Sequence, residues 1–592
     1  MNALVVLLIG VVIFIAGYFF YAKSIDRNVF QPDDKKATPA KMYMDGVDFS
    51  PANRNVLFGY QFKSIAALGP IVGPIVAVQW GWLPALLWII FGTFLIGWVQ
   101  DYSSIILGLR EEGQSSGALS YRLISPRSRS ILITFIYFYL LLIMGAFGVQ
   151  VGFSLFTNPA VPLGTIIVIL VGILAGQMTY KWKMDILVTS VITVVLAFIG
   201  IWIGTQPFAK SFFTSLYSLA PAADGKTMNS PTLFLAVTQA KFIGSLLVVI
   251  ICYFGAVLPI WRWAQPINYV SFWIVTAGII GGLIGLLIWR PGMGDFPIYT
   301  SFMQPAGPLW PMLFVTIACG AISGWHSLVS SSGTSRQIEK ESDALFVGGG
   351  AMFFEMFFAL MAFLTATVAF GSFQGYQDAG GAAAAAAVFS KGLSIFMNQW
   401  GLDAALGAGF GTAYSSVFLT LMALTIMYLV VRFMRVASAE VLGDSVPALR
   451  NPHIGTIVAL FLTLVLIWLV PFLQIWVVFG AANQLMASLA LLLITLWLIS
   501  KGKNYQWTFW PFIFMFVTTI AALLFKAYES FILNLPKAAA IAENQKLTVG
   551  QVTLANLIIG LICIVLVVAA LMLAWDALIA IQKQRAKAAA KA

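Results

Sequence analysis

The chain is poor in charged residues, histidine and cysteine, and each shortage excludes a class of protein. Asp, Glu, Lys and Arg make up 9% of its 592 residues, against about 25% in soluble globular domains. Two histidines cannot build a histidine-rich metal site, and three cysteines within apolar stretches indicate neither a disulfide framework nor a metal cluster. No Gly-rich segment ends in Gly-Lys-Ser or Gly-Lys-Thr, which argues against an ATP-driven pump. We therefore expect no cofactor and no resident metal.

Hydrophobic residues, in contrast, make up 60% of the chain, and its mean hydropathy is +0.93. Apolar stretches of about 20 residues, the length that a membrane-crossing helix needs, recur along nearly all of it. The sequence thus predicts an all-α polytopic membrane protein with about fifteen spans. The predicted spans are 3–22, 62–80, 83–109, 131–155, 160–178, 184–204, 241–259, 269–289, 308–330, 346–371, 405–433, 454–470, 473–499, 508–526 and 554–582.

The positive charges predict how these spans are oriented. The first span begins without basic residues and is followed by Lys23 and Arg27, the reverse of a cleaved signal peptide. We therefore expect a retained helix with the N-terminus outside. If the chain alternates from there, all but eight of the 33 Lys and Arg fall on the cytoplasmic side, the basic tail from Lys583 included. The net charge of +11 thus follows membrane topology and does not indicate nucleic acid binding.

Two apolar stretches are built so that a membrane helix breaks in its middle. They are Ala-Ala-Leu-Gly-Pro-Ile-Val-Gly-Pro at 66–74 and Ala-Cys-Gly-Ala-Ile-Ser-Gly-Trp-His-Ser at 318–327. Pro70 and Pro74 lack N–H groups, which frees the carbonyls four residues before them. Unpaired backbone is tolerated at membrane depth only inside protein or beside a water-filled cavity. The alternatives are a proline-kinked helix and a glycine-rich packing face, because both residues are common in membrane helices.

The two breaks lie in the second and ninth predicted spans, so they cross the membrane in opposite directions. This parity predicts inverted repeats whose two discontinuous helices meet near the bilayer centre and bind the substrate there. The residues of the breaks that we expect to contact substrate are Gly69, Pro70, Gly73, Pro74, Gly320, Ser323 and Gly324.

Three ionisable side chains lie within or beside apolar spans, where a charge costs at least about 2.5–3.5 kcal/mol at the helix centre. Glu355 and Asp101 share their helical faces with small residues, so we expect both carboxylates to point into the bundle. His326 directly follows the second break and could carry a proton. We expect ion coupling by Glu355 above all, with Asp101 and His326. Structural hydrogen bonds between helices are the alternative for each.

Neutral polar residues form a looser set of candidates. Asn483 and Gln484 could contact substrate or link helices, and Ser330 and Ser331 follow His326 toward the same path. A competing, sodium-coupled version uses the hydroxyls of Ser415 and Ser416, although hydroxyls in a span often bond their own helix. The alanine run 382–387 predicts a short helix over a vestibule in the outer loop 372–404.

The stretch 317–331, Ile-Ala-Cys-Gly-Ala-Ile-Ser-Gly-Trp-His-Ser-Leu-Val-Ser-Ser, resembles the signature of the carbon starvation protein A (CstA) family. Further similar motifs are Gly-Pro-Ile-Val-Gly-Pro at 69–74, Val-Gln-Asp at 99–101, Gly-Gly-Ala-Met at 349–352 with Glu355, and Ala-Asn-Gln-Leu at 482–485. The resemblance runs from about residue 57 to 500.

This resemblance implies a leucine-transporter-like inverted-repeat fold and ion-coupled symport of peptides, or of pyruvate in some members, across a prokaryotic cytoplasmic membrane. It also implies that the glycines of the breaks and His326 line the substrate path. The chain departs from the family at Tyr60-Gln61, where many members have two histidines. It departs again at Leu421 and Val430, where acidic residues are usual. It resembles a divergent member.

The predicted organisation has three parts. Residues 1–56 are an extra N-terminal helix and a cytoplasmic loop. Residues 57–500 are a transporter core whose repeats start at about 57 and 308, and 501–592 are two extra helices and a basic tail. We predict an ion-coupled secondary transporter, with a proton preferred to sodium, that takes up a small carboxylate-bearing nutrient such as a peptide, an amino acid or pyruvate. Its partners would be that solute, the cation and membrane lipid.

Two other functions remain open for the sequence. One is a passive channel or facilitator, which the same breaks could support. The other is an intramembrane sensor or enzyme using His326 and Glu355. It is disfavoured because no nucleophile–base pair, no multi-histidine cluster and no appended cytoplasmic domain accompanies these residues.

Overall fold

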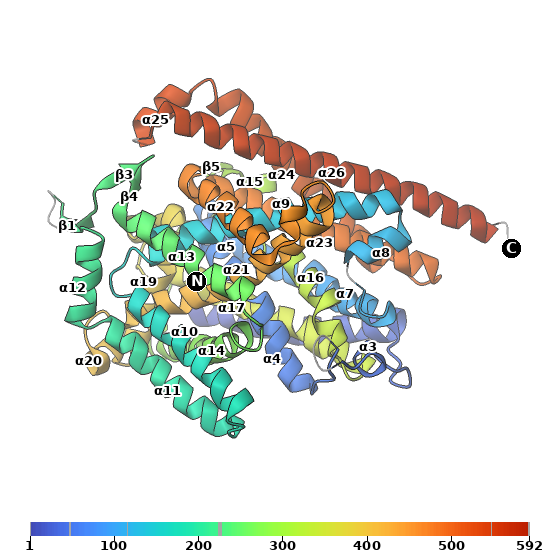
Figure 1. Ribbon diagram of the computed structural model, residues 1–592, viewed down its shortest axis with the longest axis horizontal. Helices are drawn as coiled ribbons and strands as arrows, with labels where there is room; N and C mark the ends of the chain where they lie inside the picture. Colours follow the sequence, from blue (N-terminus) through green and yellow to red (C-terminus); the bar gives the residue numbers. More distant parts are fainter. Residues whose placement is uncertain (1, 46–48, 115, 223–227, 546, 590–592) are drawn as a thin grey trace.

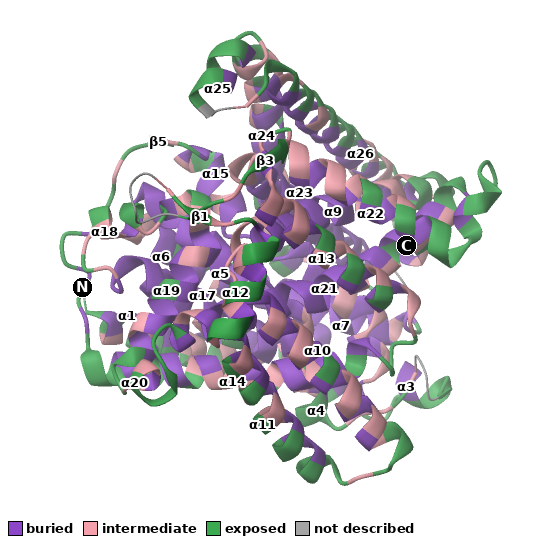
Figure 2. Ribbon diagram, turned by 60° about the vertical axis from the view of Figure 1, so that its left-hand side comes forward, coloured by how far each residue is buried: buried purple, intermediate pink, exposed green. Residues whose placement is uncertain are grey.

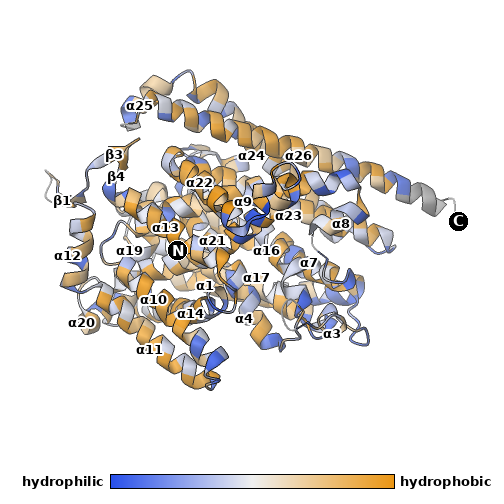
Figure 3. Ribbon diagram, in the orientation of Figure 1, coloured by the Kyte–Doolittle hydropathy of each residue, from blue (hydrophilic) through white to orange (hydrophobic). Residues whose placement is uncertain are grey.

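Helices make up nearly the whole molecule (Figure 1). The computed structural model describes residues 2–45, 49–114, 116–222, 228–545 and 547–589. Within these ranges thirteen helices are long and apolar enough to cross a membrane, and hydrophobic residues cover most of their length in Figure 3. They are Ala3–Phe30, Trp82–Arg110, Pro126–Leu155, Pro162–Lys181, Ile186–Gly204, Gln239–Val257, Ala264–Trp289, Glu341–Thr367, Phe410–Leu442, Pro452–Leu469, Phe472–Ser500, Gln506–Asn534 and Val549–Lys583. The predicted all-α polytopic membrane fold is confirmed.

These long helices are built from α-helical segments extended by wider π turns. The α-helices are α1 (Ala3–Phe14), α2 (Lys23–Ile25), α6 (Trp82–Gly92), α7 (Trp98–Arg110), α9 (Pro126–Val149), α10 (Pro162–Gly176), α11 (Ile186–Gly204), α13 (Gln239–Val257), α14 (Ala264–Trp289), α17 (Gly350–Thr367), α21 (Phe410–Leu442), α22 (Pro452–Leu469), α23 (Phe472–Ser500), α24 (Gln506–Tyr528) and α26 (Val549–Ala589). The π turns are η1 (Ile15–Ala22), η2 (Asp26–Phe30), η4 (Thr93–Gly97), η5 (Gln150–Leu155), η6 (Gln177–Lys181), η9 (Leu345–Gly349) and η12 (Glu529–Asn534).

Shorter elements connect or cover the long helices. The short α-helices are α3 (Pro39–Met42), α8 (Ser116–Leu123), α12 (Pro207–Leu216), α18 (Phe373–Asp378), α19 (Ala385–Asn398), α20 (Leu402–Leu406) and α25 (Ala538–Gln545). The 3₁₀ turns are η3 (Val78–Trp80), η7 (Thr334–Arg336), η8 (Glu341–Asp343), η10 (Gly381–Ala384) and η11 (Pro447–Arg450). Antiparallel hairpins pair β1 (Ala220–Pro221) with β2 (Met228–Asn229), β3 (Thr232–Phe234) with β4 (Val237–Thr238), and β5 (Met303–Gln304) with β6 (Gly307–Pro308).

Two further apolar segments are interrupted. In the first, α4 (Arg54–Ile65) leads into α5 (Gly69–Ala77), and the two parts are bent by 47°. In the second, α15 (Leu309–Thr316) is separated from α16 (Gly324–Ser332) by non-helical backbone. Together with the thirteen long helices, these segments account for every predicted span. Some boundaries were wrong, since α21 continues to Leu442 instead of ending at 433 and the first helix reaches Phe30 instead of 22.

The alanine-rich stretch forms the predicted short helix. It forms η10 and the beginning of α19, and most residues of α19 are buried. This helix packs against α14, α17 and α21, so it is part of the bundle. The reason is its composition, because small alanines allow close approach to neighbouring helices.

The interrupted segments pack against the helices that follow them in a reciprocal way. α5 packs against α17, the long helix after the second interruption, and α16 packs against α7, the long helix after the first. The first halves of the two segments, α4 and α15, pack in the same reciprocal way. α4 packs against η9 at the start of the α17 helix, and α15 packs against α6. Each interrupted segment thus packs against the long helix that follows the other interrupted segment.

The helices at the centre of the bundle are buried, and the peripheral helices expose hydrophobic residues on their outer faces. In α23 every residue of the most apolar window is buried, compared with 28% in the first helix. Figure 2 shows buried residues concentrated on α5, α17, α19 and α21, while α11 and α26 carry more exposed ones. α26 runs along one side of the molecule and projects beyond it (Figure 1). The last residues of the basic tail, 590–592, lie outside the described residues.

Glycine permits close contact between the backbones of the interrupted segments. A Cβ on Gly73 of α5 would lie 2.7 Å from the carbonyl oxygen of Thr316 and 3.1 Å from the Cα of Ile317. No side chain fits at this distance because the opposing atoms belong to the backbone. By contrast, a Cβ on Gly59 of α4 would meet no atom within 4 Å.

We predict that Gly73→Ala lowers the free energy of unfolding by about 1–3 kcal/mol, because the added methyl group overpacks this contact. The measurement is the Tm of the purified protein in detergent. Gly59→Ala is the matched control and should keep or raise the Tm, since alanine is the better helix former. Equal Tm values for the two variants would contradict the packing described here.

Candidate substrate and coupling site

Both interruptions are unwound, and they meet each other. Ala66 ends α4 with extended backbone (φ −71°, ψ 94°), and Ile317 and Ser323 border the second gap with φ/ψ of −88°/75° and −144°/133°. A Cβ on Gly69 would collide with the side chain of Cys319, and one on Gly320 would lie 3.4 Å from the Cα of Pro70. The prediction of two broken, adjacent segments is confirmed.

The first break is shorter than predicted. Residues 69–74 are helical, and only the neighbourhood of residues 66–68 is unwound. Pro70 lies in the first turn of α5, where its missing N–H has no helical partner in any case. Pro74 lies inside α5. Proline here starts a helix rather than ending one, which the sequence alone left ambiguous.

Side chains of neighbouring helices bind the carbonyls that the second break frees. Trp88 on α6 and Trp476 on α23 donate their indole N–H groups, Thr93 donates its hydroxyl, and Gln484 on α23 donates twice from one amide nitrogen. The bonds are Trp88 Nε1 to Phe314 O (2.9 Å), Trp476 Nε1 to Thr316 O (3.3 Å), Thr93 Oγ1 to Gly320 O (3.1 Å), and Gln484 Nε2 to Phe314 O (2.8 Å) and Ile317 O (3.1 Å). These bonds replace the helical ones that the unwound chain has lost.

Asn483 binds the other side of the break, at the start of α16. Its Oδ1 accepts hydrogen bonds from the backbone N–H groups of Gly324 (3.0 Å) and Trp325 (3.2 Å). The same oxygen accepts from Ser323 Oγ (3.1 Å) and from the hydroxyl of Tyr139 on α9 (2.7 Å). The amide oxygen thus caps the free N–H groups of the half-helix. Asn483 and Gln484, adjacent in sequence, therefore hold the start of one half-helix and the end of the other.

The three predicted ionisable residues lie together. His326 Nδ1 is 2.9 Å from Asp101 Oδ2, and His326 Nε2 is 3.3 Å from Glu355 Oε2. All three side chains are fully buried. They come from α7, α16 and α17, the helices that pack reciprocally around the two breaks. We call this group the Asp101–His326–Glu355 triad.

The triad retains unused hydrogen-bonding capacity. Asp101 Oδ1, both carboxylate oxygens of Glu355 and both amide atoms of the neighbouring Gln100 have no hydrogen-bond partner in the described structure. The contact between His326 Nε2 and Glu355 has the distance of an ion pair but not the direction of a hydrogen bond. Buried polar atoms without partners are costly, and here they lie on two carboxylates that face one imidazole. In the described part of the chain, no group of three or more His, Cys, Asp or Glu side chains is arranged to hold a metal ion.

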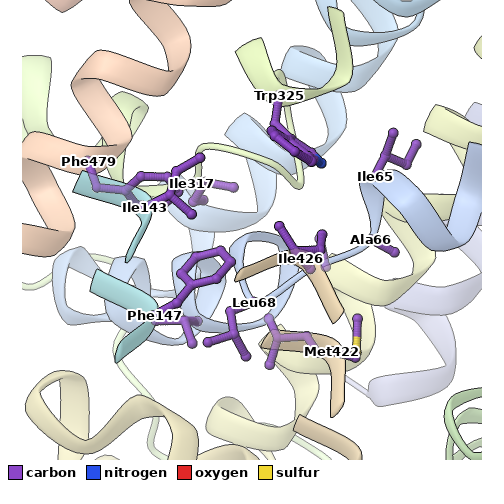
Figure 4. Close-up of a cluster of buried hydrophobic side chains, with 14 of the residues drawn as sticks. Ile65, Ala66, Leu68, Ile143, Phe147, Ile317, Trp325, Met422, Ile426 and Phe479 are labelled. Atoms are coloured by element: carbon purple, nitrogen blue, oxygen red, sulfur yellow. The ribbon is translucent and has the colours of Figure 1, made fainter. Parts of the chain in front are cut away.

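A small cavity lies between the two breaks. Ala67 and Cys319 of the breaks line it together with Trp325, Asn483 and Tyr139, and Ile143, Phe147, Ile426 and Phe479 complete its wall. Its volume of about 10 Å³ is roughly that needed for one water molecule. Figure 4 shows the surrounding side chains converging from both sides of the interruptions. We call this space the central cavity.

The remaining predicted site residues have other partners. Ser330 Oγ accepts from Gln61 Nε2 at 3.0 Å, and Ser331 Oγ donates to Ser327 O at 2.7 Å. The hydroxyls of Ser415 and Ser416 donate to carbonyls of their own helix at 2.8 Å, the alternative that the sequence left open. Of the residues predicted to bind substrate, Asn483 lines the central cavity, whereas Gly69, Gly73 and Gly320 contact the opposite break.

Sequence reasoning missed Lys63 and Tyr139. Lys63 is buried in α4, three residues before Ala66, and its Nζ donates to Thr425 Oγ1 at 3.0 Å. The position of this lysine at the start of the predicted apolar span 62–80 could have marked it as a candidate functional residue. Tyr139 lies on an ordinary hydrophobic stretch, and nothing in the sequence distinguishes it from other aromatic residues.

These features define an α-helical multi-pass membrane protein whose centre is formed by two interrupted helices around a small cavity. The family model described as carbon starvation protein CstA matches residues 2–375 and 371–522. The chain therefore belongs to the CstA family, and the resemblance inferred from its motifs is confirmed.

Curated relatives and solved structures extend this comparison. A protein named peptide transporter CstA from Escherichia coli strain K12 is 29% identical over 600 residues, covering 89% of this chain and 82% of the relative. A pyruvate/proton symporter, BtsT, from the same organism is 30% identical over 373 residues, covering 62% of this chain and 49% of the relative. A crystal structure of a mutant manganese transporter from Eremococcus coleocola matches with a TM-score of 0.40 and 13% identity, covering 90% of this chain and 96% of that one.

We predict that Asn483→Leu strongly destabilises the protein, because four donors at the start of α16 lose their common acceptor. Each buried donor left without a partner costs about 1–3 kcal/mol, so a fall in Tm of many degrees is expected in detergent. Ser488→Ala, five residues later on the same helix, is the control, because that hydroxyl only donates to Leu485 O of its own helix (3.0 Å). Similar Tm values for both variants would show that the cap is dispensable.

Proposed function

We propose that this protein is an ion-coupled secondary transporter that takes up a small carboxylate-bearing nutrient by alternating access. The names of its relatives support this class, since one is a peptide transporter and another a pyruvate/proton symporter. Within this class we place peptides, amino acids and pyruvate as the candidate solutes, and the cytoplasmic membrane of a prokaryote as the location. An outside N-terminus and a cytoplasmic C-terminus remain predictions from the positive charges.

One observation carries the proposal: the central cavity and the triad share the short helix α16. Trp325 lines the cavity, and the next residue, His326, contacts both carboxylates. A change in charge on the triad therefore acts on a nine-residue helix whose start forms the cavity wall. Such a connection is what a symporter needs between its ion and its substrate.

The coupling ion that best fits this geometry is a proton. With His326 protonated and both carboxylates ionised, the buried triad carries one net negative charge, and one more proton neutralises it. Neutralisation removes the electrostatic reason for α16 to stay between α7 and α17, since a neutral carboxyl group holds the imidazole less strongly. Proton uptake would thus loosen the wall of the central cavity, and proton release would tighten it.

Sodium coupling through Ser415 and Ser416 has less support. Both hydroxyls donate to their own helix, and no carboxylate within the described residues forms an ion pair or hydrogen bond with either. A sodium ion favours several oxygen ligands and a negative charge nearby. We therefore give the coupling role to the triad.

The reciprocal packing supports an inverted repeat within this transporter. Each interrupted segment rests on the helix that follows the other, with one carboxylate of the triad on each of these helices, Asp101 on α7 and Glu355 on α17. The π turn η4 precedes Asp101, and the π turn η9 precedes Glu355. Such turns are frequent at functional sites. Rocking of one repeat against the other would alternately expose the central cavity to the two sides of the membrane.

We predict that Glu355→Gln abolishes accumulation driven by a pH gradient while solute counterflow continues. The amide keeps the size of the carboxyl group but cannot ionise, so substrate can still exchange without proton movement. The measurement is uptake of pyruvate, amino acids and dipeptides into proteoliposomes with imposed proton or sodium gradients.

The paired variant Ser415→Ala/Ser416→Ala is the control and should keep at least about half of the wild-type uptake, with no dependence on sodium. Unchanged pH-driven uptake in Glu355→Gln would remove Glu355 from the mechanism. Wild-type flux that never runs uphill under either gradient would instead identify a passive facilitator.

A further inference from the structure

Lys63 is a buried positive charge with no negative partner. Its side chain is 5% exposed, and its one hydrogen bond in the described structure is to the neutral hydroxyl of Thr425. The other buried lysine among the described residues, Lys526, is ion-paired with Glu529 at 2.5 Å. No ion pair in the described structure joins Lys63 to a carboxylate of the triad, whose ion-pair contacts are to His326.

The partner of Lys63 cannot neutralise it. The hydroxyl of Thr425 already donates to Leu421 O at 2.7 Å, so it offers Lys63 only a lone pair. A lysine ammonium group carries three donors, and one of them is used here. The remaining donors and the charge have no protein acceptor in the described structure, which is strongly unfavourable at the buried centre of a membrane protein.

Lys63 is not part of the wall of the central cavity, but residues close to it and to Thr425 in the chain are. Lys63 is four residues before Ala67, which lines the cavity from the first break. Thr425, within hydrogen-bonding distance of its ammonium group, directly precedes Ile426 of the cavity wall on α21. Figure 4 shows Ile65, Ala66, Met422 and Ile426 in one cluster of buried hydrophobic side chains, so the segments next to Lys63 and Thr425 pack together.

We propose that Lys63 is the binding site for the carboxylate of the transported solute. The inference rests on the proposed function and specifies it: the solute must carry a carboxylate, and its body must suit an apolar pocket. The anion supplies the missing counter-charge when the cavity opens to receive it. Asn483 and Tyr139 also line the cavity, but their bond to each other and the cap of α16 already engage them.

This assignment separates two electrostatic tasks in the transporter. The triad, on α7, α16 and α17, can carry a net negative charge and binds the proton. Lys63 carries excess positive charge on α4, and it holds the organic anion. Both charges are borne by helices that adjoin the breaks, so solute and proton act on the same moving parts.

The first test uses the empty protein and needs no ligand. Lys63→Met replaces the charge by an apolar side chain of similar length, and removal of an uncompensated buried charge stabilises a protein. We expect the Tm in detergent to rise by several degrees. A Tm that falls or stays constant would show that the Lys63–Thr425 bond is structural and would overturn the proposal.

The second test compares acids with their amides. Binding of pyruvate and pyruvamide, and of alanylalanine and its C-terminal amide, is measured by counterflow competition in proteoliposomes. Lys63→Met should weaken binding of the acids at least about tenfold, because an ion pair in a desolvated site is lost, and leave the amides unchanged. Lys63→Arg should retain the preference for acids. Lys526→Met is the matched control for loss of a buried lysine and should also retain this preference.

The outcomes distinguish the two proposals. Equal weakening of acids and amides in Lys63→Met, or no weakening at all, overturns the role of Lys63 while proton-driven uptake by the wild type still supports the proposed function. If the wild-type protein accumulates none of these solutes under any gradient, the proposed function itself fails, and the role of Lys63 fails with it.

Discussion

The structure depends on the requirement that every backbone group at membrane depth finds a partner. Two apolar segments give up helical hydrogen bonds at the centre of this bundle, at Ala66 and between Ile317 and Ser323. In a bilayer such breaks persist only if other groups replace the lost bonds. α23 supplies much of this replacement, because Asn483 caps the start of α16 and Gln484 binds the carbonyls at the end of α15. The polar side chains of one buried helix thus make the interruptions possible.

The consequence is a small region where backbone, charge and cavity meet. α16 begins at the capped break, contributes Trp325 to the cavity wall and carries His326 between two carboxylates. Nine residues therefore connect the central cavity with the triad, which we propose as the proton-coupling group. The opposite charge, on Lys63, lies on the leading half of the other interrupted segment. Under the proposed function, an anion and a proton would bind at separate points and act on the same helices.

The sequence predicted the class and the broken segments because both follow from local chemistry. Hydrophobic stretches of fixed length mark the spans, and Gly69-Pro70 with Cys319-Gly320 mark the interruptions, whatever surrounds them. Burial of Glu355 and Asp101 also followed from the small residues on their helical faces. Their convergence on His326 did not, because residues on three helices are brought together only by tertiary packing. For the same reason the neutral partners of Asn483, Gln484 and Lys63 were beyond prediction, and proline in α5 was read as a break although it begins a helix.

The most direct test of the account is the reactivity of Cys319, which belongs to the second break and lines the central cavity. In a variant with Cys252 and Cys563 replaced by alanine, a membrane-impermeant thiol reagent is added to proteoliposomes at rest and during solute uptake. The account predicts slow modification at rest, a much faster reaction once solute and a proton gradient are supplied, and loss of uptake after modification. Continued uptake with Cys319 unmodified at every stage, or with Cys319 fully modified, would contradict a transport path between the two breaks.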